Sequence, residues 1–187
     1  MSTFSKITVL IALVLIVALL MISVVLLGNI TEQKIYPDDY SDIVEKYAEE
    51  FGIDKYLIHS IIWVESSYDK NAVSSSGARG LMQISEGTLP DINVMLGELY
   101  SFDDMFDPEI NVRCGVCYLN YLFKRFGDMQ LVIAAYNGGP TNVANWLKNE
   151  EYSDGERLIK IPIEQTERYV NKVNACYEKY AELYENE

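Results

Sequence analysis

The chain has 187 residues, of which 49% are apolar, and a formal net charge of −13 at pH 7. This length suits one domain with a single core plus an appendage. The acidic balance argues against binding to nucleic acid or to anionic lipid headgroups, because like charges repel.

Residues 7–27 form an uncharged stretch of 21 residues in which only Thr8 and Ser23 are polar. A helix of that length spans the hydrocarbon layer of a membrane. The alternative is a cleaved signal peptide, but its apolar core is usually about 7–15 residues and ends at a small-residue cleavage site. No such site follows Ser23, so we expect a retained transmembrane anchor.

The charges on either side of this stretch predict its orientation. Lys6 precedes it and acidic residues follow it, so the positive-inside rule places residues 1–6 in the cytoplasm. Residues 28–38 are then expected to be a polar tether, with a reach of at most about 35 Å when extended. Residues 39–187 are expected to form one domain on the outer side of the cell membrane.

Helix signals begin at residue 41. Asp42 is a candidate cap for a first helix, with Glu45 at the capping-box position and Gly52 as its end. Asp54 is placed to cap a second helix that runs to about Ser66.

The later helix signals are of the same kind. Asp107-Pro108 opens a helix that Gly127 ends, and Asp128 caps the next one, which stops at residues 137–140. A short helix is expected over residues 143–147, and a long last helix after Pro162. No strand alternation extends beyond a few residues, so the predicted fold is mainly α.

Glu65 interrupts an apolar stripe on the second predicted helix. Ile58, Ile61 and Ile62 follow helical spacing, and Glu65 takes the next position on that face. Burial disfavours a charged carboxylate, so the pKa of Glu65 should rise. A carboxylic acid that is protonated near neutral pH is what a glycosidic oxygen requires from a general acid. The plainer alternative is a glutamate at a helix end that turns towards water.

Seven separated segments, the first of which begins at Glu65, form an ordered series of short motifs. They are residues 65–68 (ESSY), 71–74 (NAVS), 77–84 (GARGLMQI), 111–119 (NVRCGVCYL), 134–140 (AAYNGGP), 161–162 (IP) and 169–170 (YV). In this order they resemble the signature motifs of the soluble lytic transglycosylase family, over about residues 40–180. The glycines in these segments would let the backbone approach a bulky ligand closely.

The resemblance implies a lysozyme-like domain, similar to goose-type lysozyme, that cleaves peptidoglycan between N-acetylmuramic acid and N-acetylglucosamine. Glu65 carries over as the catalytic acid, which then takes a proton from the muramoyl 6-hydroxyl and leaves a 1,6-anhydro end. The residues that carry over as substrate-binding are Ser74, Met82, Gln83, Tyr136 and Asn137; the alternative for these is a structural role in polar loops. The expected partners are glycan strands and the membrane, with no nucleic acid, cofactor or metal.

Two other functions are compatible with the same residues. A hydrolase of this fold normally needs a second carboxylate, and the nearby loop acids Asp69, Glu86 and Asp91 lie in no motif that the family assigns to that role. A wall-binding scaffold would keep the cleft but would have no reason to bury an acid. The chain also departs from the family at Gln165, where an acid is usual, so Gln165 is not counted as a site residue.

The cysteines allow three interpretations. Cys114 and Cys117 lie three residues apart on one predicted helix, and Cys176 lies on the last one. They could form a zinc site with His59, a disulfide from Cys176 to one of the pair, or free thiols that fill a helix interface. Packed free thiols are the interpretation we favour.

Overall fold

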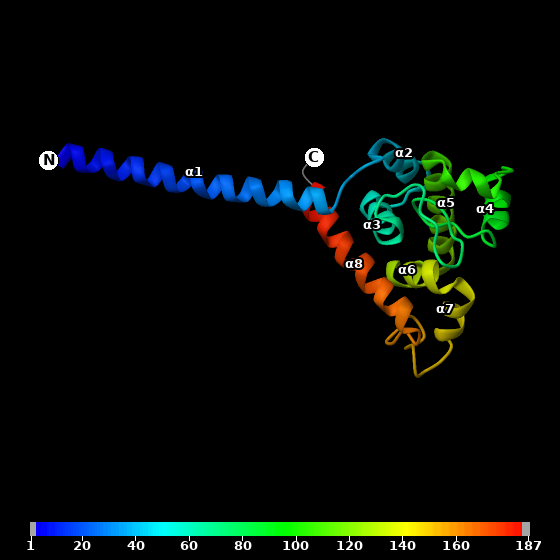
Figure 1. The fold of residues 1–187 in the computed structure, drawn as a ribbon. Coiled ribbons are helices and arrows are strands. Elements are labelled where there is room, and N and C mark those ends of the chain that lie inside the picture. Colours follow the sequence, from blue (N-terminus) through cyan, green and yellow to red (C-terminus); the bar gives the residue numbers. More distant parts are fainter. Residues whose placement is uncertain (1–2, 185–187) are drawn as a thin grey trace. The chain divides into compact units, whose positions relative to one another are not determined.

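The computed structural model describes residues 3–184, apart from the side chains of residues 3–9, 12, 25, 26, 29 and 30. The chain divides into two units, one that ends at Pro37 and one that begins at Asp38. The first unit is a single helix, α1 (Thr3–Ile35), and the second holds all the other elements (Figure 1).

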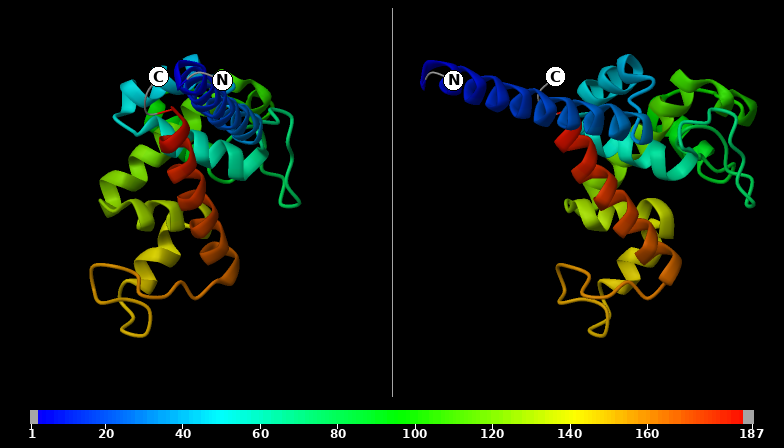
Figure 2. Two further views of the ribbon diagram at one scale, coloured as in Figure 1. Left: turned by 90° about the vertical axis from the view of Figure 1, so that its left-hand side faces the viewer. Right: turned by 60° about the vertical axis from the view of Figure 1, so that its left-hand side comes forward.

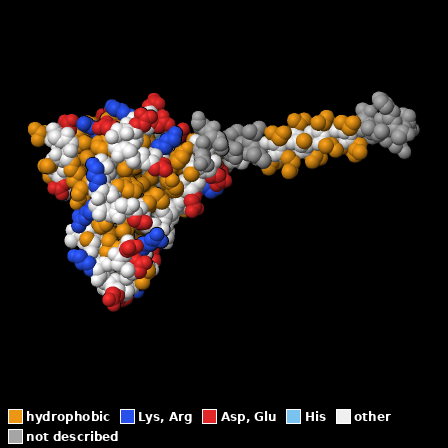
Figure 3. Space-filling view, turned by 180° about the vertical axis from the view of Figure 1, so that it is seen from behind, with side chains coloured by type: hydrophobic (Ala, Val, Ile, Leu, Met, Phe, Trp, Pro, Cys, Tyr) orange, Lys and Arg blue, Asp and Glu red, His pale blue; other side chains and the backbone are white. Residues whose placement is uncertain are grey.

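The predicted transmembrane stretch lies on α1. Several of its side chains, and that of Lys6, fall outside the described residues. Figure 3 shows apolar side chains along the part of α1 whose side chains are described. Within that described part of the chain, no helix is both long enough and apolar enough to cross a membrane. The anchor therefore stays a prediction.

Most of the predicted tether, residues 28–38, belongs to α1. Because no proline occurs before Pro37, α1 continues to Ile35, and most of residues 28–38 is helical rather than extended. A helix rises about 1.5 Å per residue, less than half the length of an extended chain. A helical segment of this length thus spans less than the upper limit of about 35 Å, and the tether stays a prediction.

The second unit is built from seven α-helices and one 3₁₀-helix among residues 38–184. They are α2 (Ser41–Phe51), α3 (Lys55–Ser66), α4 (Leu89–Leu96), η1 (Phe102–Phe106), α5 (Pro108–Phe126), α6 (Met129–Gly138), α7 (Pro140–Trp146) and α8 (Glu164–Tyr184). α5 packs against α2, α4, α6 and η1, whereas α8 packs against α3 and α6 (Figures 1 and 2). Only isolated β-bridges occur among the described residues, so the prediction of a mainly α fold is confirmed.

Most of the predicted helix boundaries are confirmed. The carboxylates of Asp54, Asp107 and Asp128 each accept a hydrogen bond from a backbone N–H in the first turn of α3, α5 and α6. Gly52 and Gly127 end α2 and α5 in the left-handed conformation, where glycine has no Cβ to clash. These boundaries could be predicted from the sequence because each depends on one contact between residues that are close in the chain.

Three boundaries differ from the prediction. Tyr40, not Asp42, precedes α2, and no side chain caps that helix. α7 begins at Pro140 rather than near residue 143, because proline is well suited to a first helical position. Neither α4 nor η1 was predicted, because both are too short to show a clear periodicity in the sequence.

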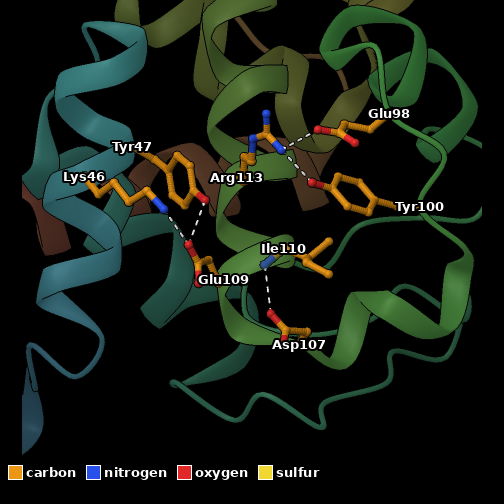
Figure 4. Close-up of polar contacts among 8 residues, drawn as sticks. All are labelled: Lys46, Tyr47, Glu98, Tyr100, Asp107, Glu109, Ile110 and Arg113. Atoms are coloured by element: carbon orange, nitrogen blue, oxygen red, sulfur yellow. Dashed lines mark hydrogen bonds and ion pairs between the residues drawn. The ribbon is translucent and has the colours of Figure 1, made fainter.

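Polar contacts on α5 hold neighbouring segments in register (Figure 4). Lys46 and Tyr47 of α2 both donate hydrogen bonds to Glu109 Oε1, and Arg113 donates to Glu98 at 2.9 Å. The Lys46–Glu109 pair is more than half exposed, so its contribution to stability is small. These contacts therefore orient α2 and the segment before η1 more than they stabilise them.

All three cysteines are free and buried. The disulfide alternative is therefore wrong, and the thiols fill helix interfaces. Burial raises the pKa of the Cys114 thiol to about 12 and that of Cys176 to about 11. Among the described residues, no group of three or more His, Cys, Asp and Glu side chains could hold a metal ion.

One fully buried side chain, Asn111 of α5, fixes the loop that follows α3. Its Nδ2 donates to the carbonyl oxygens of Arg79 and Met105 at 2.9 and 2.8 Å, and its Oδ1 accepts from the Met82 N–H at 2.7 Å. Gly80 permits this approach, since a Cβ there would lie 2.1 Å from Met105 O. The bonds to Met82 and Met105 are buried, whereas the Arg79 carbonyl is part-buried and also accepts from the Ile84 N–H. The amide of Asn111 is therefore required chiefly by the Met82 N–H and the Met105 carbonyl.

We predict that Asn111→Leu destabilises the domain strongly. Leucine has a similar volume but leaves the Met82 N–H and the Met105 carbonyl without their buried partner, at about 1–3 kcal/mol each, so the total loss should be about 2 kcal/mol or more. The free energy of unfolding by denaturant measures it. The exposed Asn145 of α7 offers a matched control, Asn145→Leu, which should change stability by no more than about 0.5 kcal/mol. Equal effects of the two substitutions would contradict the role given to Asn111.

Candidate active site

Glu65 lies in the last turn of α3. The three isoleucines that precede it on the same face, Ile58, Ile61 and Ile62, are fully buried, whereas Glu65 itself is half-buried. Burial raises the pKa of the Glu65 carboxyl to about 7, against the opposing effect of a hydrogen bond from Tyr169. The expected upward shift is therefore present, and a large fraction of Glu65 is protonated at neutral pH.

The partner of Glu65 comes from the far end of the sequence. Tyr169 Oη donates a hydrogen bond to Glu65 Oε1 at 2.7 Å, because α8 packs along α3. The sequence placed Tyr169 in the buried stripe of the last helix, and it is 7% exposed. Periodicity located its ring correctly but gave no information on the partner of its hydroxyl.

A cleft of about 470 Å³ opens beside Glu65. Five predicted site residues line it: Glu65, Ser74, Gln83, Tyr136 and Asn137. Ser74 and Gln83 come from the segment between α3 and α4, and Tyr136 and Asn137 from the end of α6, so the fold brings the predicted residues together. Their contacts with substrate remain predictions.

Gln83 and Tyr136 are both held by internal hydrogen bonds. Gln83 has a positive φ of 51°, and its Nε2 donates to the carbonyl oxygens of Ala72 and Gly80 at 3.1 and 2.9 Å. Tyr136 Oη donates to the Met82 carbonyl at 2.9 Å. Burial and the charge of Glu65 raise the pKa of Tyr136 well above its usual value, so this phenol stays neutral.

The serine loop is braced by its own polar groups. Ser74 Oγ accepts a hydrogen bond from the Ala78 N–H at 3.0 Å and lies 3.0 Å from Ser76 Oγ. Ser74 N–H also donates to the Ala78 carbonyl. This closed turn gives the loop a fixed shape on one side of the cleft.

Met82 does not line the cleft, contrary to the prediction. Its side chain is fully buried and packs against Gly115 of α5, where a Cβ would come within 2.2 Å of its sulfur. The backbone of Met82 is what reaches the site, through the hydrogen bonds to Asn111 and Tyr136. The motif identified the right segment, and the packing on α5 decided which way the side chain turns.

Several lining residues were not predicted. Tyr118 of α5 lies in the cleft with its ring centroid 5.7 Å from that of Tyr136, and Ser85, Thr88 and Gln165 line it as well. Tyr118 lies in the motif at residues 111–119, so its position in that motif could have identified it as a cleft residue. Gln165 was set aside because of the departure from the family pattern, yet it lines the cleft.

The arrangement combines one carboxyl group with neutral polar and aromatic side chains. Glu65 is the only carboxylate among the described residues that line the cleft; Asp69, Glu86 and Asp91 do not line it. Hydroxyl, amide and phenol groups are the partners that an uncharged sugar chain requires. The site is therefore suited to proton transfer on a neutral, hydroxyl-rich ligand.

Comparison with known proteins agrees with this chemistry. The family model described as "Transglycosylase SLT domain" matches residues 42–159. The soluble lytic murein transglycosylase of Escherichia coli K12 is 33% identical over 150 residues, which cover 78% of this chain and 23% of that protein. The membrane-bound lytic murein transglycosylase C of Pectobacterium atrosepticum is 32% identical over 169 residues, with 75% and 46% covered.

Solved structures show the same likeness. The 70 kDa soluble lytic transglycosylase from Escherichia coli superposes with a TM-score of 0.73 at 31% identity, over 81% of this chain and 25% of that one. An inactive mutant of lytic transglycosylase Slt from Pseudomonas aeruginosa gives 0.71 at 31% identity, with 79% and 24% covered. The fold is thus the mainly helical, lysozyme-like fold of lytic transglycosylases.

The chain spans only about a quarter to a half of the length of these relatives. Nevertheless, the family model covers more than half of this chain, and the part it covers contains Glu65 and most of the cleft. The chain therefore belongs to the transglycosylase SLT domain family.

Proposed function

We propose that this protein is a membrane-anchored lytic transglycosylase of peptidoglycan. It cleaves the β-1,4 bond between N-acetylmuramic acid and N-acetylglucosamine without water and leaves 1,6-anhydro ends. The observation that carries the proposal is Glu65, a half-buried carboxyl with a pKa of about 7 and no second carboxylate among the described lining residues.

Glu65 acts twice in the proposed reaction. Its proton passes to the glycosidic oxygen as the bond from that oxygen to muramoyl C1 breaks. The resulting carboxylate then accepts the proton of the muramoyl 6-hydroxyl, whose oxygen forms a new bond to C1. The internal hydroxyl replaces water as nucleophile, so no second carboxylate is needed. The carboxyl group ends each cycle protonated, as it began.

Tyr169 supports both protonation states in this scheme. Its hydroxyl donates to Glu65 Oε1, which favours the carboxylate formed midway through the reaction. Burial favours the protonated form and keeps the pKa near 7. A group poised between its acid and base forms at the working pH is suited to give and then take one proton.

The relatives support the proposal by what their names state. Those described above are soluble and membrane-bound lytic murein transglycosylases. The Pseudomonas aeruginosa structure is of a mutant in which a glutamate is replaced by glutamine, and that mutant is inactive. An essential glutamate in that relative is consistent with a single catalytic carboxyl here.

The products test the reaction. Purified enzyme incubated with peptidoglycan should release fragments that carry 1,6-anhydromuramoyl ends, detectable by mass spectrometry as a mass lower by one water. Fragments with reducing muramoyl ends would instead assign the protein as a hydrolase of lysozyme type. Binding to the strands without any cleavage would instead indicate that the protein is a wall-binding scaffold.

The same assay tests Glu65. Glu65→Gln should lower cleavage by about 10⁴-fold or more, the upper end for loss of a general acid, since one group acts in two steps. Glu86→Gln is a matched control, because Glu86 is exposed and lies outside the cleft. Its activity should equal that of the wild type. Comparable activity of Glu65→Gln would assign the proton transfers to another group.

The pH dependence follows from the raised pKa of Glu65. The acid form is required in the free enzyme, so kcat/KM should be constant at low pH and fall as pH rises through about 7. Tyr169→Phe removes the hydrogen bond that lowers this pKa, so the fall should move to higher pH. A fall centred near pH 4.5 in the wild type, or no shift in Tyr169→Phe, would contradict the assignment.

Anchoring rests on residues 7–27 and on membrane-bound relatives such as lytic murein transglycosylase C. We predict that the full chain stays with membranes after a high-salt and carbonate wash. Leu13→Arg with Leu20→Arg should release it, since each charge costs about 2.5–3.5 kcal/mol at a helix centre. Leu99→Arg is the control and should stay bound, because the Leu99 side chain is 97% exposed in the segment after α4. A native N-terminus between residues 28 and 32 would instead indicate a cleaved signal peptide.

A further inference from the structure

A second hollow lies beside Glu65 and continues onto one face of α8. It measures about 520 Å³ and shares Glu65, Asn137 and Gln165 with the cleft. Its additional charged residues are Arg168 and Lys172, one turn apart on α8. We call it the α8 hollow.

The charge of the α8 hollow contrasts with its surroundings. The chain has 28 acidic and 15 basic residues, and no Lys or Arg lines the cleft itself. At helical spacing, Gln165, Arg168 and Lys172 share one face of α8, and Glu167 lies on the opposite face. Two cations and the amides of Asn137 and Gln165 therefore converge on one space.

Both cations are available to a ligand. Arg168 pairs with Glu164 at 3.0 Å, but these side chains are 67% and 78% exposed, so the pair is weak. The guanidinium has five N–H donors, most of which this one contact leaves unused. No ion pair involves Lys172 among residues 38–184. A donor set of guanidinium, ammonium and amides suits a carboxylate.

We propose that Arg168 and Lys172 bind a carboxylate of the peptide substituent on the glycan strand. This inference rests on the proposed function. The muramoyl sugar of peptidoglycan carries a short peptide with free carboxyl groups, and the same sugar provides the carbon attacked in the reaction. An anionic substituent is therefore present near the bond that Glu65 protonates, and the α8 hollow begins at Glu65.

The position of the two cations is compatible with catalysis. The pKa of Glu65 is set by its burial and by Tyr169, so neither cation forces the carboxyl to ionise. A protonated Glu65 also does not repel an incoming carboxylate. The α8 hollow can thus hold an anion without disturbing the acid next to it.

The expected consequence is selectivity between strands. Wild-type enzyme should cleave strands with free peptide carboxylates with a kcat/KM about three- to tenfold higher than strands whose peptide carboxylates are amidated, the range expected for two exposed charge contacts. The difference should shrink towards 1 M salt, where the screening length is about 3 Å.

The test compares full-length enzyme on three substrates: native strands, strands with amidated peptide carboxylates, and strands from which an amidase has removed the peptides. The test variant is Arg168→Gln with Lys172→Gln. The control variant is Lys179→Gln, on the same helix two turns beyond Lys172 and outside the α8 hollow. All are exposed or partly exposed positions, so folding should be preserved.

The proposal expects the double variant to lose the preference for native strands and to keep the wild-type rate on peptide-free strands. The control should keep the preference. Equal wild-type rates on native and amidated strands would overturn the carboxylate site but leave the lytic activity standing. Absence of anhydro products from all three substrates would refute the proposed function itself.

Discussion

The three hydrogen bonds of the buried Asn111 amide are the constraint on which the site depends. They tie the carbonyls of Arg79 and Met105 and the N–H of Met82 to α5. A loop without regular structure thereby acquires a fixed path across the helical core. That path sets the positive φ of Gln83 and presents the Met82 carbonyl to Tyr136. The wall of the cleft is thus determined by one side chain that does not itself line it.

Helix packing supplies the second part of the site. α3 carries Glu65, and α8 brings Tyr169 to within 2.7 Å of it. Burial of the carboxyl in the folded domain raises its pKa to about 7, and α8 provides the donor that limits this effect. Glu65 and the tyrosine that donates to it are 104 residues apart in the sequence, so the proton affinity of the site is a property of the folded domain.

The sequence predicted well the features that depend on neighbours in the chain. The caps at Asp54, Asp107 and Asp128 and the burial of the isoleucines before Glu65 follow from spacing alone. The family motifs located the cleft segments, but which side chain of a segment faces the cleft depends on packing. Met82 turns inward because Gly115 leaves room for its sulfur, and a contact between distant helices cannot be read from either motif.

The burial of the thiols has a consequence for how the protein is handled. Only a thiolate reacts readily with oxidants or alkylating reagents, and with a pKa of about 12 the Cys114 thiol is ionised at pH 7 on the order of once in a hundred thousand molecules. Burial therefore slows the reaction of these thiols with such reagents for as long as the domain stays folded. Alkylation of these cysteines would therefore indicate that the domain had unfolded, and the rate of alkylation would measure the rate of unfolding.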